Sequence, residues 1–253
     1  MSDLKLSIDD GIARIVFDRP AVLNALSPSL LQALIETCGE LGQDESTRVV
    51  LLQGAGGCFS AGADLPAFLG SLTGSDPHAT ADLGRRATLA VAALPQITVA
   101  GISGHCVGGG LVLAGACDMR IAADDTRFSI PELDAGIPLG WGGMEYLIRL
   151  VGETLAADLV LSCRPFAPDE ALRAGLISRI VPADRLDDEL AALAADIAQK
   201  PLSVLRVTKR QLAAIRAGTF DARTDADALM STLHDPEALE VGQQYLATRI
   251  RKT

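Results

Sequence analysis

The sequence predicts an α/β protein whose C-terminal part is helical. Two observations predict the mixed first part: an alternating hairpin pattern opens the chain, and a unit of apolar strand, glycine-rich loop and helix then occurs twice. The third observation concerns residues 202–251, which have helical periodicity and no further strand pattern. We therefore expect a core domain over residues 1–198 and a helical region over residues 199–253.

The first elements are a hairpin and a helix. Residues 4–17 alternate apolar and polar side chains on either side of Asp9-Asp10-Gly11, which is a turn sequence. Residues 27–41 place apolar side chains at helical spacing, with Ser27 as the N-cap and Pro28 at the first helical position.

Two short apolar runs, residues 48–53 (RVVLLQ) and 97–102 (ITVAGI), are typical of strands that are buried on both faces. Each ends at a glycine-rich loop. We expect a helix over residues 81–94 between them, and a short helix (110–117) and a strand (118–122) after the second loop. Residues 66–80 contain GSLTGSDPHAT, which predicts a flexible surface insertion.

The remainder of the chain is predicted to be mostly helical. A strand is expected over residues 176–181, and the helices are expected over residues 141–151, 153–161, 168–174, 187–199, 202–217, 222–233 and 236–251.

Charge and composition argue against several classes of function. With 22 basic and 32 acidic residues, the net charge of −10 disfavours nucleic acid and anionic membranes as main partners. The longest apolar stretch, residues 89–102, is shorter than the roughly 18 residues of a membrane span, and the N-terminus lacks a signal-peptide pattern. Five dispersed cysteines form no metal-binding pattern. We expect a cytoplasmic protein with no membrane span, no metal site and reduced cysteines.

Small residues dominate the loops that follow the two buried strands. These loops are FSAGADL (residues 59–65) and GISGHCVGGG (residues 101–110). A backbone N–H can reach a ligand oxygen only where no side chain intervenes, so two such loops can place two donors together. The spacing matches neither the dinucleotide fingerprint nor the Walker pattern.

Four segments in fixed order resemble the enoyl-CoA hydratase/isomerase (crotonase) superfamily: Arg19-Pro20 with Asn24-Ala25-Leu26, then FSAGADL, GHCVGGGLVLAGACD and FSIPELDAGIPLGWGG. The resemblance implies that residues 1–198 form a ββα spiral core that binds acyl-CoA. It also implies that residues 199–253 are a helical trimerisation region, which gives a homotrimer or hexamer. The implied substrate is an acyl-CoA thioester, and no metal or redox cofactor is implied.

The resemblance also implies the residues of the site. The backbone N–H groups of Ala61 and Gly109 would form an oxyanion hole, and Glu132 would move a proton. Lys209, Arg249 and Lys252 lie where family members meet the CoA phosphates. The residues implied to bind substrate are Ala61, Gly62, Ala63, Asp64, Leu65, Gly109, Val112 and Trp141.

Many family members carry two catalytic glutamates, but this chain has only the second of them, Glu132. Val112 stands at the position of the first. This one-acid pattern resembles 3,2-enoyl-CoA isomerases, because a single carboxylate can take a proton from C2 and return it at C4. We expect the apolar Val112 to raise the pKa of Glu132 by desolvation. The alternatives are a 2-enoyl-CoA hydratase that uses Glu132 with an unidentified second group, and a non-catalytic acyl-CoA-binding protein.

Overall fold

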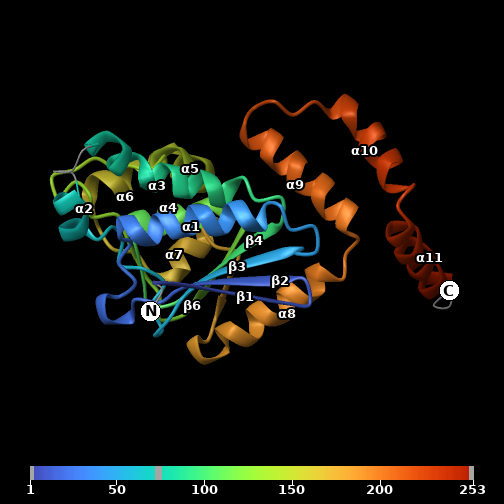
Figure 1. Cartoon of the computed structure of the whole chain (residues 1–253), viewed down its shortest axis with the longest axis horizontal. Helices are drawn as coiled ribbons and strands as arrows, with labels where there is room; N and C mark the ends of the chain where they lie inside the picture. Colours follow the sequence, from blue (N-terminus) through green and yellow to red (C-terminus); the bar gives the residue numbers. More distant parts are fainter. Residues whose placement is uncertain (1–2, 72–75, 251–253) are drawn as a thin grey trace.

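A six-stranded sheet forms the centre of the protein (Figure 1). The structure is a computed structural model, and it describes residues 3–71 and 76–250. The strand order of the sheet is β1-β2-β3-β4-β6-β8. The first pair is antiparallel and the other neighbours are parallel. Its strands are β1 (Leu4–Asp9), β2 (Ile12–Phe17), β3 (Val49–Gly54), β4 (Ile97–Ile102), β6 (Met119–Ala123) and β8 (Arg179–Val181).

Helices cover both faces of this sheet, with α1, α3 and α4 on one side and α8 on the other (Figure 1). Alternate residues of β3, such as Val50 and Val49, point into the two separate apolar clusters. The core helices are α1 (Pro28–Leu41), α2 (Leu65–Ser71), α3 (Pro77–Ala92), α4 (Gly109–Ala116), α5 (Gly143–Val151), α6 (Glu153–Ser162), α7 (Pro168–Arg173) and α8 (Leu186–Ala198). The α/β class predicted from the sequence is confirmed.

The loops after β3 and β4 come together because parallel strands end at the same edge of a sheet. The N–H of Ser60 donates to the carbonyl of His105 (2.8 Å), and the N–H of Val107 donates to the carbonyl of Ser60 (3.0 Å). These bonds place the two small-residue loops side by side.

A second, two-stranded parallel sheet was not expected from the sequence. It pairs β5 (His105–Val107) with β7 (Arg127–Ser129). Three residues are too few for an alternating pattern to be recognised in a sequence. The small sheet continues into Gly108, whose N–H donates to the carbonyl of Ser129 (2.9 Å), so it fixes the chain that enters α4.

The segment expected to be a flexible insertion over residues 66–80 is helical at both ends. Helix α2 takes its first part, and α3 begins at Pro77, four residues before the predicted start, with Asp76 capping it through the N–H of Ala79. Leu65, Phe68 and Leu69 follow helical spacing, and a single apolar turn is easily overlooked among glycine and serine residues. Residues 72–75 of the predicted insertion lie outside the described residues.

The C-terminal helices form an arm that leaves the core (Figure 1). They are α9 (Leu202–Arg216), α10 (Asp225–Thr232) and α11 (Pro236–Ile250). Helix α9 is held by Lys209, whose Nζ lies 2.6 Å from Oδ2 of the buried Asp118, the residue immediately before β6. Glu237 of α11 pairs with Arg48 beside β3 (2.7 Å). Among residues 3–71 and 76–250, no helix combines the length and the apolar character that crossing a membrane requires.

Candidate active site

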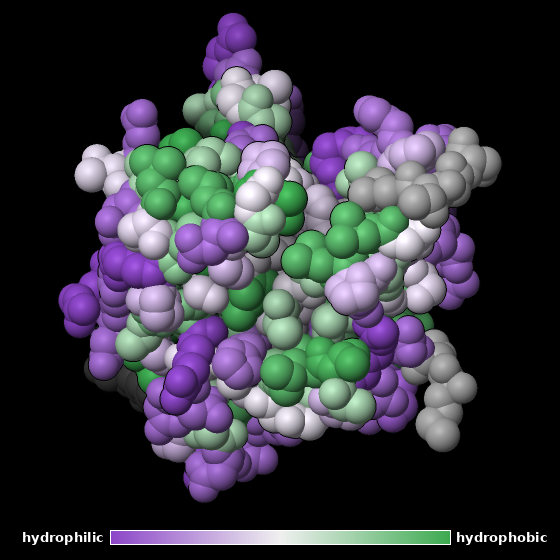
Figure 2. Space-filling view, turned by 90° about the vertical axis from the view of Figure 1, so that its left-hand side faces the viewer, coloured by the Kyte–Doolittle hydropathy of each residue, from purple (hydrophilic) through white to green (hydrophobic). Residues whose placement is uncertain are grey.

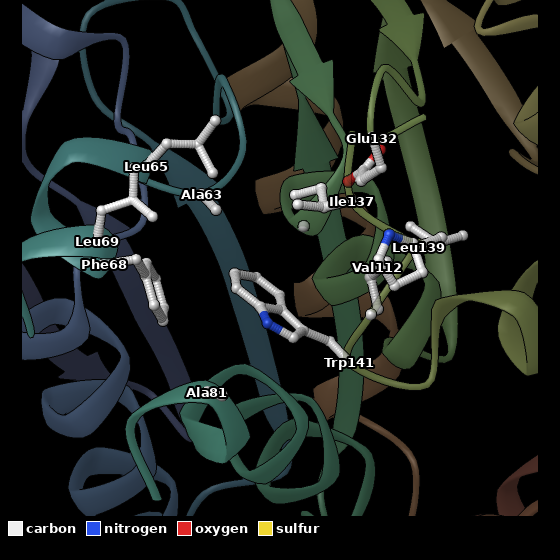
Figure 3. Close-up of a pocket in the computed structure, with 13 residues that line it drawn as sticks. Ala63, Leu65, Phe68, Leu69, Ala81, Val112, Glu132, Ile137, Leu139 and Trp141 are labelled. Carbon is white, nitrogen blue, oxygen red and sulfur yellow. The ribbon is translucent and has the colours of Figure 1, made fainter. Parts of the chain in front are cut away.

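An apolar cavity of about 200 Å³ lies between α2, α3, α4 and the loop that joins β7 to α5 (Figure 3). A smaller cavity of about 80 Å³ adjoins it and shares Ala63, Leu65, Glu132 and Ile137 with it. Among the described residues that line either cavity, Glu132 has the only ionisable side chain. Residues lining the larger one are Ala63, Leu65, Phe68, Leu69, Ala81, Gly109, Val112, Glu132, Ile137, Pro138, Leu139, Gly140 and Trp141.

The cavity opens on the α2 side of the molecule, where several large apolar side chains are exposed. Figure 2 views this side and shows apolar patches around a hollow. Leu65 and Leu69 come from α2, whereas Leu133 and Ile137 come from the loop that carries Glu132. A mouth with such a rim suits a ligand with a substantial apolar part.

Glu132 follows β7 and is held in a tight turn. The N–H of Ile137 donates to its carbonyl (3.0 Å), and the N–H of Ala135 donates to the carbonyl of Pro131 (3.1 Å). Its Oε2 atom is buried and has no hydrogen-bond partner among the described residues. Burial raises the pKa of Glu132, as expected from the apolar residues around it. A carboxyl group with a raised pKa can act both as base and as acid near neutral pH.

Gly108 leaves room for the carboxylate of Glu132. The residue has φ +48°, and a Cβ there would overlap Oε1 of Glu132. Glycine therefore allows the carboxylate to lie against the backbone that enters α4.

The N–H groups of the first loop differ from the sequence prediction. The N–H of Ala61 donates to the carbonyl of Leu23 (2.9 Å), so the prediction that Ala61 supplies an oxyanion donor is wrong. The N–H of Gly62 donates to Oγ of Ser60 (3.1 Å), and that of Asp64 donates to the carbonyl of Leu26 (3.0 Å). Between them, the N–H of Ala63 has no partner among the hydrogen bonds of the described residues, and Ala63 lines both cavities.

This loop is anchored by the buried Asn24. Its side-chain amide donates to the carbonyls of Ala55 (2.9 Å) and Cys58 (2.6 Å), and its Oδ1 accepts from the N–H of Arg19 (2.8 Å). Ser60 donates through Oγ to the carbonyl of Asn24 (2.9 Å). The side chains of Asn24 and Ser60 therefore fix the position of the loop that carries the Ala63 N–H.

The second candidate donor lies at the start of α4. Gly109 is the first residue of this helix, so its N–H has no intrahelical acceptor. The residue also lines the larger cavity. The positive end of the helix dipole lies at the same place and favours a developing negative charge.

Val112, at the position of the missing glutamate, is buried in α4 and lines the cavity together with Glu132 (Figure 3). A Cβ at Gly143 would lie 2.6 Å from its Cγ2, so α5 packs directly against this valine. The side of the cavity that α4 forms at this point is therefore apolar.

The structure brings together most of the residues that were predicted to bind substrate. Gly109, Val112 and Trp141 line the larger cavity, Ala63 and Leu65 line both cavities, and Ala61 and Gly62 line the smaller one. Asp64 lines neither, because its side chain pairs with Arg19 (2.9 Å) and caps α2 through the N–H of Ala67 (3.2 Å).

Sequence reasoning missed Phe68 and Leu69 as cavity residues, although their helical spacing with Leu65 was a usable signal. Asp134, two residues after Glu132, is exposed and lines neither cavity. Lys209 is buried against Asp118 in this chain, and the side chains of Arg249 and Lys252 lie outside the described residues. In the described part of the chain, no three His, Cys, Asp or Glu side chains are grouped as a metal site requires.

Comparisons with known proteins point to one family. The family model described as "Enoyl-CoA hydratase/isomerase" matches residues 7–249. A probable enoyl-CoA hydratase of Mycobacterium avium is 38% identical over 209 residues, which are 83% of this chain and 80% of the relative. A similar fold is found in an enoyl-CoA hydratase from Bacillus anthracis, which has a TM-score of 0.89 at 29% identity and covers 97% of this chain and 96% of its own. An enoyl-CoA hydratase/carnithine racemase from Magnetospirillum magneticum has a TM-score of 0.91 at 30% identity, with coverages of 98% and 94%.

Proposed function

Since the chain belongs to the enoyl-CoA hydratase/isomerase family, we propose that it moves the double bond of a 3-enoyl-CoA thioester to the 2-position. One observation carries this choice: among the described residues that line the two cavities, Glu132 has the only ionisable side chain, and Val112 is the side chain that α4 contributes to the larger cavity. A double-bond shift requires one group that takes and returns a proton, and one carboxylate suffices for that.

The thioester oxygen would accept hydrogen bonds from the N–H groups of Ala63 and Gly109. Both belong to cavity residues, and neither N–H is used in the described hydrogen-bond network. Removal of a proton from C2 places negative charge on this oxygen, and each fixed donor in such a site contributes about 3 kcal/mol to stabilising that charge. Ala63 thus replaces Ala61 as the proposed donor of the first loop.

Glu132 would carry out both proton transfers. Its carboxylate accepts the proton from C2, and the electron pair of the C–H bond moves into a dienolate whose charge rests on the thioester oxygen. The protonated Glu132 then returns the proton at C4, so that the double bond ends between C2 and C3. Atoms and charge balance without a metal or redox cofactor, and CoA enters as part of the substrate.

Hydration of a 2-enoyl-CoA is the second candidate, and the names of the relatives favour it, since the Mycobacterium avium protein is called a probable enoyl-CoA hydratase. A hydratase must hold a water molecule and pass its proton to C2. With Val112 at the position of a second glutamate, the described lining residues supply one carboxylate for this task. The apolar wall is the reason to rank isomerisation first.

We expect the helical arm to build a homotrimer, or a hexamer of two trimers. Helices α9–α11 and their connections carry exposed large apolar side chains, including Leu212, Ile215, Phe220, Leu229, Met230, Leu233, Leu239 and Leu246. The arm leaves the core (Figure 1), so these side chains are available to neighbouring copies. With a chain of 26.4 kDa, light scattering should give 79.2 kDa for a trimer or 158.4 kDa for a hexamer, and a monomer would contradict the proposal.

The deciding experiment compares two substrates and two variants. Purified protein is mixed with a 3-enoyl-CoA and, separately, with a 2-enoyl-CoA, and the absorbance of the conjugated thioester is followed. Isomerase activity makes it rise and hydratase activity makes it fall. Glu132→Gln should lose at least a hundredfold in rate, whereas Asp134→Asn, which changes an exposed acid of the same loop, should keep the wild-type rate. An unchanged rate in Glu132→Gln would overturn the mechanism.

A further inference from the structure

The indole of Trp141 fills the space between helices α3 and α4. A Cβ on Gly84 of α3 would overlap the five-membered part of the indole, and a Cβ on Gly109 of α4 would overlap its six-membered part. The ring therefore lies against the backbones of both helices. Glycine at both positions is what gives it this room.

The backbone of Trp141 is held in an uncommon conformation. Its φ is +60°, and Gly142 follows with φ +79°. A left-handed conformation is unfavourable for a bulky side chain and persists only where surrounding contacts determine it. The contacts of the indole with Gly84 and Gly109 supply such a constraint, so the ring has little freedom to swing out of the cavity.

Phe68 of α2 meets the same indole from the other side of the cavity. The two ring centroids are 6.0 Å apart and the rings are tilted by 40°, which leaves no space for a further group between them. Figure 3 shows Glu132 on one side of the cavity and Phe68 on the other, with the indole of Trp141 between them. An acyl chain that extends from Glu132 into the cavity therefore reaches the wall formed by Trp141 and Phe68.

We propose that Trp141 sets the length of the acyl group that this site accepts, and that Gly84 acts with it by leaving the slot in which the indole lies. The proposal rests on the proposed function, because that function places the thioester at Ala63 and Gly109 and points the chain into the cavity. A cavity of about 150 Å³ holds benzene, so one of about 200 Å³ has room for about six to eight carbon atoms. The substrate class is thus a short to medium acyl-CoA.

The two residues that define the slot should shift the preference in opposite directions. Trp141→Ala removes the wall and opens the space between α3 and α4, so longer chains gain access. Gly84→Ala adds a methyl group where the indole now lies and forces the ring toward the cavity, so the accepted chain becomes shorter. A tryptophan that only packed the core would change stability in both variants without reordering chain length.

The test measures affinities of saturated acyl-CoA thioesters of four to twelve carbons for the full-length protein by calorimetry. In the wild type, affinity should rise about fourfold for each methylene group buried, and should stop rising when the cavity is full. In Trp141→Ala the rise should continue for several further methylene groups, and in Gly84→Ala it should stop earlier. Trp141→Phe should lie between the wild type and Trp141→Ala. Because Trp141 is the only tryptophan, its emission in the wild type should change only with chains long enough to reach it.

Phe166→Leu is the matched control. Phe166 is a buried aromatic residue that stacks on Phe128 (centroids 5.3 Å apart) and lines neither cavity, so its replacement should leave the chain-length profile unchanged.

Identical profiles in the wild type, Trp141→Phe and Gly84→Ala would overturn the inference, even if Trp141→Ala fails to fold. Saturated thioesters bind without turnover, so a shifted profile in a protein that isomerises no 3-enoyl-CoA would support the inference while the proposed function failed. A wild type that binds no acyl-CoA would overturn both.

Discussion

The carboxylate of Glu132 lies directly against the backbone of Gly108, in the space that a Cβ at this position would occupy. This contact joins the proposed proton-transfer group to the start of α4, whose first residue, Gly109, carries one of the two N–H groups proposed to bind the thioester oxygen. The relative position of this acid and the proposed oxyanion donor therefore depends on a glycine between β5 and α4.

Replacing Gly108 should separate these two parts of the site. In Gly108→Ala the new methyl group displaces the carboxylate of Glu132, and we expect kcat to fall by about a hundredfold, as is found for catalytic groups moved by about an ångström. Steady-state kinetics would check this. Gly218→Ala is the control, since Gly218 also has a positive φ (+66°) but a methyl group added there would meet no neighbouring side chain or backbone within 4 Å. Equal losses in both variants would mean that backbone strain, and not the contact with Glu132, causes the effect.

The raised pKa of Glu132 predicts a pH dependence of the rate. Burial raises this pKa above the ordinary range of glutamate, and the deprotonated form is needed to take the proton from C2. The kcat/KM for a 3-enoyl-CoA should therefore fall as pH decreases through the raised value, at a higher pH than an exposed glutamate would give. A profile that stays flat down to about pH 4.3, the ordinary glutamate pKa, would contradict this assignment.

The same shift has a consequence for stability. A carboxyl group whose pKa is higher in the folded than in the unfolded chain favours folding when protonated, so folding stability decreases as pH rises from the unfolded to the folded pKa. Glu132→Gln removes the buried charge, and its melting temperature should exceed that of the wild type at pH 7. The difference should vanish below about pH 4, where glutamate is protonated in both states. Thermal unfolding at the two pH values measures this.

Part of this site could be predicted from the sequence and part could not, for physical reasons. Glu132 and Gly109 lie in contiguous motifs whose local conformation places them. Which N–H of the first loop stays free depends on tertiary hydrogen bonds: the carbonyls of Leu23 and Leu26 accept from the N–H groups of Ala61 and Asp64, and the turn at Gly62 (φ +94°) leaves the N–H of Ala63 without a partner among the described residues. Residue types alone do not distinguish two alanines that stand two positions apart.

The fold, too, was predictable from the sequence only in part. Strands β3 and β4 were predictable because a strand buried on both faces is a continuous apolar run. Strands β5 and β7 were not, because three-residue strands depend on each other and on the loops that they join. The wall that we propose to limit chain length was only partly predictable: Trp141 was expected in the pocket, but Gly84 lies on α3 far from any motif, and only the folded chain brings the two together.

The ion pair that holds the C-terminal arm should be important for stability. Lys209 and Asp118 are 2.6 Å apart, with side chains that are 5% and 4% exposed. Burial acts to raise the pKa of Asp118, but Lys209, Thr98 and Arg216 more than offset it, so this pKa is lowered. Lys209→Met leaves a buried carboxylate with fewer partners, and the free energy of unfolding should fall by roughly 3 kcal/mol. Denaturant unfolding measures it. In Lys5→Met, which removes an ion pair to Asp18 from a lysine that is 66% exposed, the loss should stay below about 1 kcal/mol.

A second carboxylate at position 112 should change the reaction. Val112→Glu places an acid in α4 on the cavity wall, where it can hold water together with Glu132, so hydration of a 2-enoyl-CoA should rise at least tenfold relative to isomerisation. The two carboxyl groups share one cavity, so each raises the pKa of the other, and the gain should be largest above neutral pH. Val112→Gln is the control, because it has nearly the same size and polarity but no ionisable group. If Val112→Gln gains as much as Val112→Glu, added polarity suffices; if the wild type already hydrates faster than it isomerises, the apolar wall does not select the reaction. Both rates are read from the absorbance of the conjugated thioester, with opposite signs, in one instrument and on one protein preparation.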